Sequence, residues 1–238
     1  MPRPRRSLRL LAWTALGGIV LAAAPSLLVP GQSLESDLSS GETHTYRAEL
    51  AAGHAWRIAV EQRGIDVEVA AQGPDGRRTI VDGPFDRQGI ETLVIAPAAS
   101  GVFEIAVTAR EPAAPAGRYE IRLDDLSGAD PHRAAAESTM SRAGERYREG
   151  APGRRQALAE YRQAAEEWWA AGDRREEARA LYAAAVLARL VDDTREALKT
   201  GQEALPLWQG LGDRLWEGAT WNETGLDHWQ LGETAEAR

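Results

Sequence analysis

The sequence predicts a multidomain chain of α and β structure, in which an N-terminal signal or anchor helix precedes an all-β sandwich and then an α-helical solenoid. Three observations lead to this prediction. A basic stretch precedes an apolar one at the N-terminus, apolar and polar residues alternate in the middle, and a near-repeat with a period of 40 residues fills the last third. The predicted domains are a signal or anchor at 1–32, the sandwich at 33–126, a linker at 127–133, and helical repeats at 134–238 with the last repeat truncated.

The N-terminus has the pattern of an export signal. Four arginines, Arg3, Arg5, Arg6 and Arg9, precede the apolar stretch 10–29. A positive region stays on the cytoplasmic side while the apolar region enters the bilayer. If it is not cleaved, the stretch is about long enough to span as one helix, since roughly 20 residues are needed. We expect an exported protein, periplasmic or anchored in the inner membrane facing the periplasm, with membrane contact through this segment only. The alternative, a buried N-terminal helix, is disfavoured by the basic flank.

The sandwich region has a period of two, which is typical of strands with one buried and one solvent-exposed face. The alternation is clear in residues 56–61, 65–69 and 119–124. Turn residues such as those at 74–76 separate these runs. The region therefore predicts seven or eight short strands in two packed antiparallel sheets.

Four aspartates of this region, Asp66, Asp75, Asp82 and Asp86, could supply oxygen ligands for a calcium ion. They lack the dense spacing of a calcium-binding loop. We therefore favour their interpretation as turn residues and solvated strand residues, with the calcium site as the alternative.

Helix breakers and caps delimit the helices of the last third. Asp130 followed by Pro131 is a good helix start, and Asp173 and Thr194 are the predicted caps of later helices. Thr234 opens a further helix that the chain does not complete. The predicted helices span 131–149, 154–171, 173–190, 194–209 and 213–231.

The near-repeat returns Trp168 as Trp208, and residues 172–174 as 212–214. Such a period is typical of a solenoid, in which each unit stacks on a neighbour to bury its apolar face. The pattern resembles the tetratricopeptide repeat in a 40-residue form, with His228 where an aromatic is usual. The resemblance implies that small residues let paired helices approach and that large ones fill the gaps. The implied repeat-packing residues are Gly144, Tyr147, Ala157, Tyr161, Ala164, Leu181, Ala185, Ala197, Ala204, Trp221, Gly225, His228, Gly232 and Ala237.

The tryptophans of the helical region raise the question of a binding surface. At helical spacing they more often fill a core than form a binding platform, so we expect most of them in the core. Trp168 and Trp169 are neighbours and cannot both face the same seam. Trp169 is therefore expected at the surface or against the sandwich. In the alternative, where exposed aromatics line a repeat surface, Trp169 and Trp216 are the candidate partner-binding residues.

The composition and motifs exclude several functions. A formal charge of −8 disfavours a general nucleic-acid binder, which needs a basic face to displace counterions. The lack of cysteine excludes disulfides, thiolate metal sites and a cysteine nucleophile within this segment. The sequence has no Gly-x-Ser-x-Gly, no His-Glu-x-x-His and no glycine-rich phosphate loop. We expect no enzyme activity in this segment, no cofactor and no metal.

Two resemblances bear on function. Through residues 41–46, 65–69, 74–76 and 99–103, the sandwich is similar to the bacterial pre-peptidase C-terminal type. In exported proteins that type implies an accessory, non-catalytic role. The order of export signal, sandwich and repeats resembles the front of a bacterial CHAT protein, in which the repeats lead into a caspase-like peptidase domain.

These observations predict an exported interaction module, in which the repeats bind a peptide or protein partner and the sandwich is an accessory domain. The alternative is the non-catalytic recognition or regulatory part of a CHAT peptidase, whose catalytic domain lies beyond residue 238. The helical unit that begins at Asp213 lacks its second helix. We therefore expect the apolar face of Trp221, Leu226 and Trp229 to be partly uncovered.

Overall fold

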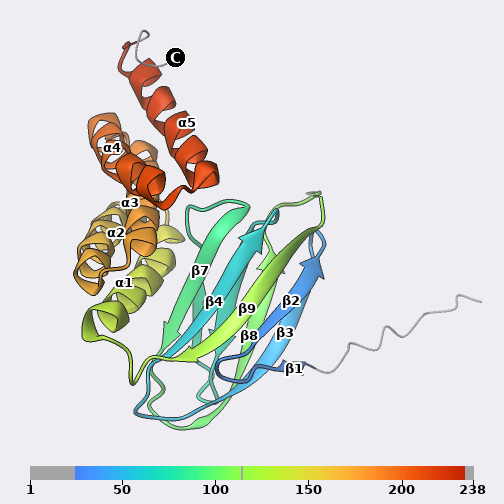
Figure 1. Ribbon diagram of the computed structural model, residues 1–238. Helices are drawn as coiled ribbons and strands as arrows, with labels where there is room; N and C mark the ends of the chain where they lie inside the picture. Colours follow the sequence, from blue (N-terminus) through green and yellow to red (C-terminus); the bar gives the residue numbers. More distant parts are fainter. Residues whose placement is uncertain (1–24, 114, 234–238) are drawn as a thin grey trace, which may run out of the picture.

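The structure is a computed structural model that describes residues 25–113 and 115–233, in which nine strands are followed by five helices (Figure 1). Most of the predicted leader, residues 1–24, lies outside the described residues, and so do Thr234 and Ala237. Within the described ranges, no helix has the length and apolar character needed to cross a membrane. The predicted order of β structure followed by helices is confirmed.

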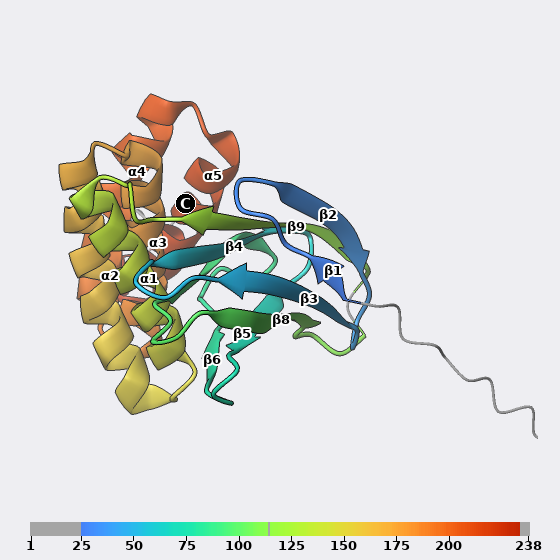
Figure 2. The ribbon, with the colours of Figure 1, turned by 90° about the horizontal axis from the view of Figure 1, so that it is seen from below.

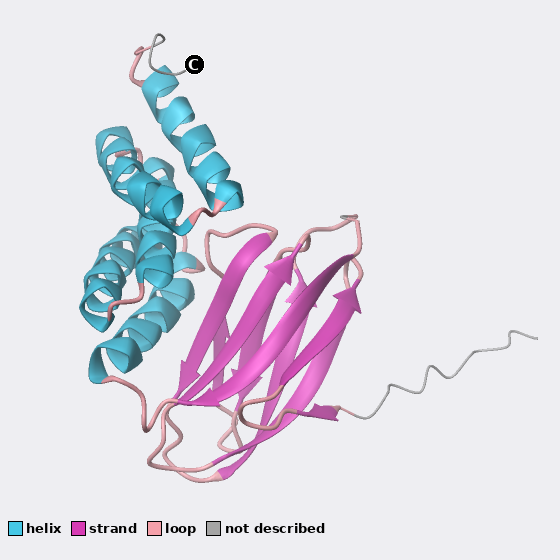
Figure 3. Cartoon of the chain, in the orientation of Figure 1, coloured by secondary structure: helices cyan, strands magenta, loops and turns pink. Residues whose placement is uncertain are grey.

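The strands form two sheets that pack face to face (Figure 3). One sheet has the order β1-β3-β8-β5-β6 and the other the order β2-β9-β4-β7. All pairs are antiparallel except the short parallel pair of β1 with β3. The bounds are β1 Ser26–Leu27, β2 Ser33–Leu38, β3 Thr43–Leu50, β4 Trp56–Arg63, β5 Val67–Gln72, β6 Arg78–Val81, β7 Gln88–Ile95, β8 Gly101–Ala109 and β9 Gly117–Asp125.

The core of the sandwich follows from the period of two. Ile58 and Val60 of β4 and Ile121 of β9 are fully buried between the sheets. The predicted boundary between leader and sandwich at residue 32 is wrong, because Leu28 is buried in this core and Ser26 pairs with β3. The apolar stretch that was assigned to the leader runs directly into the first strand, so composition alone does not separate them.

The five helices lie close to the predicted ranges. Their bounds are α1 Pro131–Tyr147, α2 Ala151–Ala171, α3 Arg174–Leu190, α4 Thr194–Leu211 and α5 Arg214–Gln230. Asp130, Asp173 and Asp213 cap their helices through side-chain oxygens that accept backbone N–H bonds. For α4 the predicted cap Thr194 is wrong by one residue, because the Asp193 carboxylate accepts the bond from the Glu196 N–H.

Two predicted boundaries of the helical region are corrected by the structure. The linker ends at Asp130, since residues 131–133 already belong to α1. Helix α2 begins at Ala151 instead of residue 154, because a proline is tolerated in the first helical turn, where no backbone donor is needed. Gly153 then lies inside the helix at a close approach: a Cβ there would lie 2.2 Å from the Arg146 carbonyl oxygen.

The helices pair in sequence order, and the first of them joins the helical array to the sandwich. Helix α1 packs on β7 and β6, the edge strands on one side of the two sheets (Figure 2). Helix α5 extends away from the sandwich (Figure 1). The molecule therefore has one face of the helical array turned toward the sandwich and another turned to solvent.

Candidate functional site at the junction of the two modules

Seven of the fourteen predicted repeat-packing residues are buried within the helical array. The buried ones are Ala157, Tyr161, Ala164, Leu181, Ala185, Ala197 and Ala204. Tyr147 is half-buried, with the Arg154 guanidinium 5.4 Å from its ring centroid. Gly225 and His228 are half-buried, Gly232 is exposed, and Ala237 lies outside the described residues.

Gly144 is buried, and the atoms nearest to it outside α1 belong to the sandwich. A Cβ at this position would lie 3.2 Å from the Cβ of Val81 on β6. The small residue therefore brings α1 close to a strand, and its role in helix pairing stays a prediction. Sequence periodicity predicts that another element approaches α1 closely at this residue, but not which element it is.

Helix α5 buries one face and exposes another. Its buried residues are Trp216, Thr220, Thr224 and Asp227. Thr224 packs against Gly201 of α4, where a Cβ would lie only 2.6 Å from the Thr224 Cγ2 atom. The opposite face presents Trp221, Leu226 and Trp229, which are 54%, 43% and 67% exposed. The expected uncovered face is confirmed, and more than half of the Trp221 side chain lies in solvent.

The two candidate partner-binding tryptophans have different environments. Trp169 is 61% exposed, as expected from its buried neighbour Trp168. Trp216 is only 8% exposed, so the expectation that it is an exposed partner-binding aromatic is wrong. Its ring stacks on Trp208 at 5.6 Å between centroids and meets Tyr182 edge-on at 4.9 Å.

A side chain of the sandwich completes this aromatic cluster. Phe85 lies in the loop between β6 and β7, yet it belongs to the helical core and is 5% exposed. Its ring meets Tyr161 of α2 edge-on at 6.2 Å and Trp216 of α5 at 6.4 Å. Sequence reasoning missed Phe85, although an isolated aromatic after Gly83-Pro84 in a turn was a usable signal.

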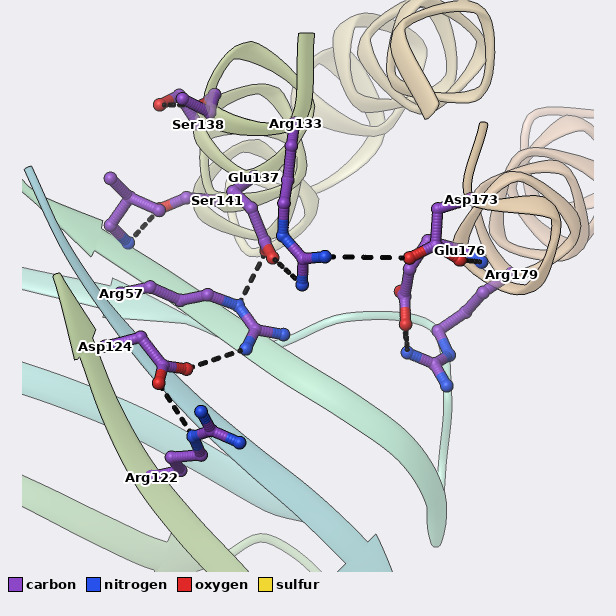
Figure 4. Close-up of polar contacts among 12 residues, drawn as sticks. Arg57, Arg122, Asp124, Arg133, Glu137, Ser138, Ser141, Asp173, Glu176 and Arg179 are labelled. Atoms are coloured by element: carbon purple, nitrogen blue, oxygen red, sulfur yellow. Dashed lines mark hydrogen bonds and ion pairs between the residues drawn. The ribbon is translucent and has the colours of Figure 1, made fainter. Parts of the chain in front are cut away.

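Polar contacts join the α1 segment to the sandwich at three levels, and Figure 4 shows those of Glu137 and Ser141. Near its first turns, the Glu137 carboxylate lies 2.7 Å from Nε of Arg57 on β4. In the middle, the Val94 N–H of β7 donates to the Ser141 hydroxyl at 2.9 Å. Just after the helix ends, Arg148 pairs with Glu68 at 2.8 Å. The sandwich thus contacts α1 over its whole length.

The Arg57–Glu137 pair is a buried ion pair with charged neighbours. Asp124 of β9 lies 3.3 Å from the Arg57 guanidinium, and Arg133 lies 3.9 Å from Glu137. Burial alone would lower the pKa of Arg57, but the carboxylates of Glu137, Glu176 and Asp124 reverse this and raise it. Burial raises the pKa of Glu137, and the Arg57 charge opposes this rise. The contact between the two side chains orients α1 on the sheet.

Acidic side chains gather at the base of the Phe85 loop. Asp66, Asp82 and Asp86 line one hollow of about 390 Å³, together with Arg110, whereas Asp75 lies at a separate turn where it accepts the Arg77 N–H. Among the residues that the structure describes, no three acidic or histidine side chains form a group that could hold a metal ion. The interpretation of Asp75 as a turn residue is therefore supported.

Burial and like charges raise the pKa values of these carboxyls. The pKa of Asp66 rises from 3.8 to about 7, first through burial and then through the charges of Asp82, Asp86 and Glu111. Burial raises the pKa of Asp82, and it raises that of Glu91 well above its usual value. Glu91 accepts hydrogen bonds from Gln62 at 3.3 Å and from the Gly83 N–H at 2.8 Å.

We expect Asp66→Asn to make the protein more stable than wild type at pH 8 but not at pH 4. Between about pH 4 and pH 7 folded Asp66 binds a proton that the unfolded chain has released, so stability falls as the pH rises through this window. The full rise in the pKa of Asp66, from 3.8 to about 7, corresponds to about 4 kcal/mol. Because the group is half-buried, solvent screening reduces the expected gain to about 1–2 kcal/mol. Urea unfolding at both pH values measures it.

The exposed Asp75→Asn variant is the control for Asp66→Asn, since its side chain lies outside the acidic group. As an exposed substitution it is expected to change stability by at most about 0.5 kcal/mol. A gain for Asp66→Asn that is the same at pH 4 and pH 8 would show that the Asp66 carboxyl does not titrate in this window.

A serine, a histidine and an aspartate lie together at the end of β9, but not in catalytic order. His54 Nδ1 lies 2.8 Å from the Asp125 carboxylate, and the Ser127 hydroxyl donates to that same carboxylate. In a nucleophilic triad the imidazole lies between the hydroxyl and the acid. Here the acid lies between the other two, so His54 is not placed to take the Ser127 proton.

The solvent-facing side of the helical array carries an apolar groove. It encloses about 540 Å³ between α2, α3 and α4, and its apolar wall includes Trp169, Ala165, Leu181 and Leu207. Arg162 and Glu203 form part of the rim and lie 3.6 Å apart. The groove offers a partner an exposed aromatic ring with small side chains beside it.

The chain matches no protein-family model, and a search of curated proteins finds no match. Its structure is similar to the pre-peptidase C-terminal domain of a collagenase from Bacillus anthracis, with 14% identity, a TM-score of 0.35 and coverage of 42% of this chain and 95% of that one. It is similar to the TPR domain of Arabidopsis FLU, with 17% identity, a TM-score of 0.41 and coverage of 45% and 88%. A signal transduction ATPase with a tetratricopeptide repeat sensor from Pyrococcus horikoshii matches with 18% identity, a TM-score of 0.41 and coverage of 47% and 17%.

Proposed function

We propose that this segment is a protein-interaction module, in which the helical repeats bind a peptide or protein partner and the sandwich is an accessory domain. The observation that carries the proposal is the groove between α2, α3 and α4, where Trp169 is 61% exposed. A large aromatic side chain in a hollow is typical of the anchor points of protein interfaces. The proposal assigns no catalytic step to these residues.

The location of the groove supports this assignment. The sandwich packs on α1, and its Phe85 reaches Tyr161 and Trp216, so that side of the helical array is already covered. The groove around Trp169 lies between α2 and α4 and contains no residue of the sandwich. A partner can therefore bind there without displacing the accessory domain.

The groove also suggests which side chains a partner presents. Its floor is formed by alanines and leucines, so an apolar side chain of the partner would replace water against Trp169. On the rim, Arg162 pairs with Glu203 and Glu177 pairs with Arg174. We therefore assign the affinity to apolar contact and a smaller contribution to charge.

Trp169→Ala is expected to weaken partner binding at least tenfold, because truncation of an interface anchor costs about 2 kcal/mol or more. A partner is first captured through a photo-crosslinking side chain at position 170, and its affinity is then measured by titration calorimetry. The matched control is Trp229→Ala, which removes an equally exposed tryptophan from α5. Equal losses in both variants, or none in Trp169→Ala, would contradict the proposed surface.

A further inference from the structure

The helical module has an aromatic groove that a loop of the sandwich fills. Tyr161, Tyr182, Trp208 and Trp216 come from four successive helices and form this groove. The ring of Phe85 enters it edge-on against Tyr161 and Trp216. Phe85 is thus an anchor that one module inserts into the other, as in interfaces between separate proteins.

The remainder of the loop is bound to the sandwich. The Gly83 N–H donates to Glu91, the Arg87 carbonyl accepts from the Gly64 N–H at 2.9 Å, and the Gln88 N–H donates to the Phe85 carbonyl at 3.1 Å. All of these partners belong to the sandwich or to the loop itself. The ring of Phe85 is therefore the main contact between the loop and the aromatic groove.

The bound form of the loop contains an unfavourable feature. Asp86 has φ of +48°, a left-handed conformation that costs free energy for a residue other than glycine. Asp66 and Asp82 lie beside it in the same hollow, where Arg110 pairs with Asp82 at 3.3 Å and burial raises the pKa of Asp66. The backbone conformation of Asp86 weakens the closed position of the loop without touching the aromatic groove.

Withdrawal of the loop does not require the two modules to separate. The contacts of α1 with Arg57, Val94 and Glu68 are made outside the loop and hold the helical array on the sandwich. A second hollow of about 390 Å³ lies beside the loop, lined by Gln88, Leu215 and Trp216 among others. An incoming segment therefore has space next to the ring that it would replace.

We propose that the aromatic groove is a second binding site, for a turn of a partner protein that carries a phenylalanine after a proline, and that the chain's own Phe85 loop occupies it until such a partner displaces it. The chemistry of the ligand follows from the segment that fills the groove, Gly83-Pro84-Phe85. This site is separate from the groove around Trp169. Its test does not depend on the outcome of the partner experiment above.

The test is complementation by a peptide with the sequence of residues 82–88, added to the full-length chain. Phe85→Ala empties the groove. The matched control is Phe103→Ala, which removes the other phenylalanine of the chain, from the core of the sandwich. We expect the peptide to bind Phe85→Ala at least ten times more tightly than wild type or Phe103→Ala, as measured by calorimetry and tryptophan fluorescence. A peptide with alanine in place of its phenylalanine is expected not to bind.

A folded Phe85→Ala variant that binds the peptide no better than Phe103→Ala would overturn the proposal. Phe85→Leu is the second variant, in case Phe85→Ala does not fold, because leucine keeps most of the apolar volume. We expect it to give an intermediate affinity for the peptide. Loss of the helical circular dichroism signal in both Phe85 variants would also overturn the proposal, since the ring would then be a fixed part of the core.

Discussion

Glu137→Ala is expected to lower the free energy of unfolding by about 3 kcal/mol. The substitution leaves the Arg57 guanidinium buried without the carboxylate that lies 2.7 Å away. Removal of one partner of a buried ion pair costs about 3–5 kcal/mol. The expected loss is at the lower end because Asp124 remains 3.3 Å from the same guanidinium. Urea unfolding followed by circular dichroism measures it.

Two further variants separate the buried charge from other effects of the Glu137 substitution. The double variant Arg57→Leu with Glu137→Leu is expected to recover most of the loss, because desolvation of a buried pair offsets most of its attraction. Arg146→Ala breaks an exposed pair with Glu149 and is expected to change stability by at most about 0.5 kcal/mol. A double variant less stable than Glu137→Ala alone would contradict the assignment of the loss to an unpaired buried charge.

The local structure follows closely from the sequence. Alternating residues predict β4, β5 and β9, because each strand has one face in the core. The end of α2 follows from Gly172, which takes the left-handed conformation after the helix. Helix α4 runs past its predicted end at residue 209 to Leu211, before the left-handed Gly212. The errors at helix starts have a local cause, since Asp193 and Thr194 are both good caps and only the fold decides between them.

The junction of the two modules could not be predicted in this way. The contacts of Arg57 with Glu137 and of Phe85 with Trp216 join residues far apart in the sequence. Periodicity states which face of an element is buried but not what covers it. For this reason the sequence does not predict that Gly144 lies against Val81 or that Trp216 is buried against Phe85.

Trp208→Ala is expected to cost about 3–5 kcal/mol of unfolding free energy, the range for truncation of a large buried aromatic. Trp208 is fully buried, and its ring stacks on Trp216. The cavity would therefore open in the wall of the aromatic groove. The control is Trp229→Ala, which truncates a tryptophan that is 67% exposed and is expected to change stability by about 0.5 kcal/mol or less. Similar losses in the two variants would contradict the packing described for α4 and α5.

Trp208→Phe separates the packing of the ring from the role of its nitrogen. The Trp208 Nε1–H is buried and has no hydrogen-bond partner among the described residues, and such an unsatisfied donor costs about 1–3 kcal/mol. Phenylalanine removes this donor and keeps an aromatic ring against Trp216, so the gain offsets part of the lost contact area. We therefore expect Trp208→Phe to cost less than half as much as Trp208→Ala. Equal costs would mean that Nε1 makes a bond in solution, and that the polar group contributes to the stability of the helical core.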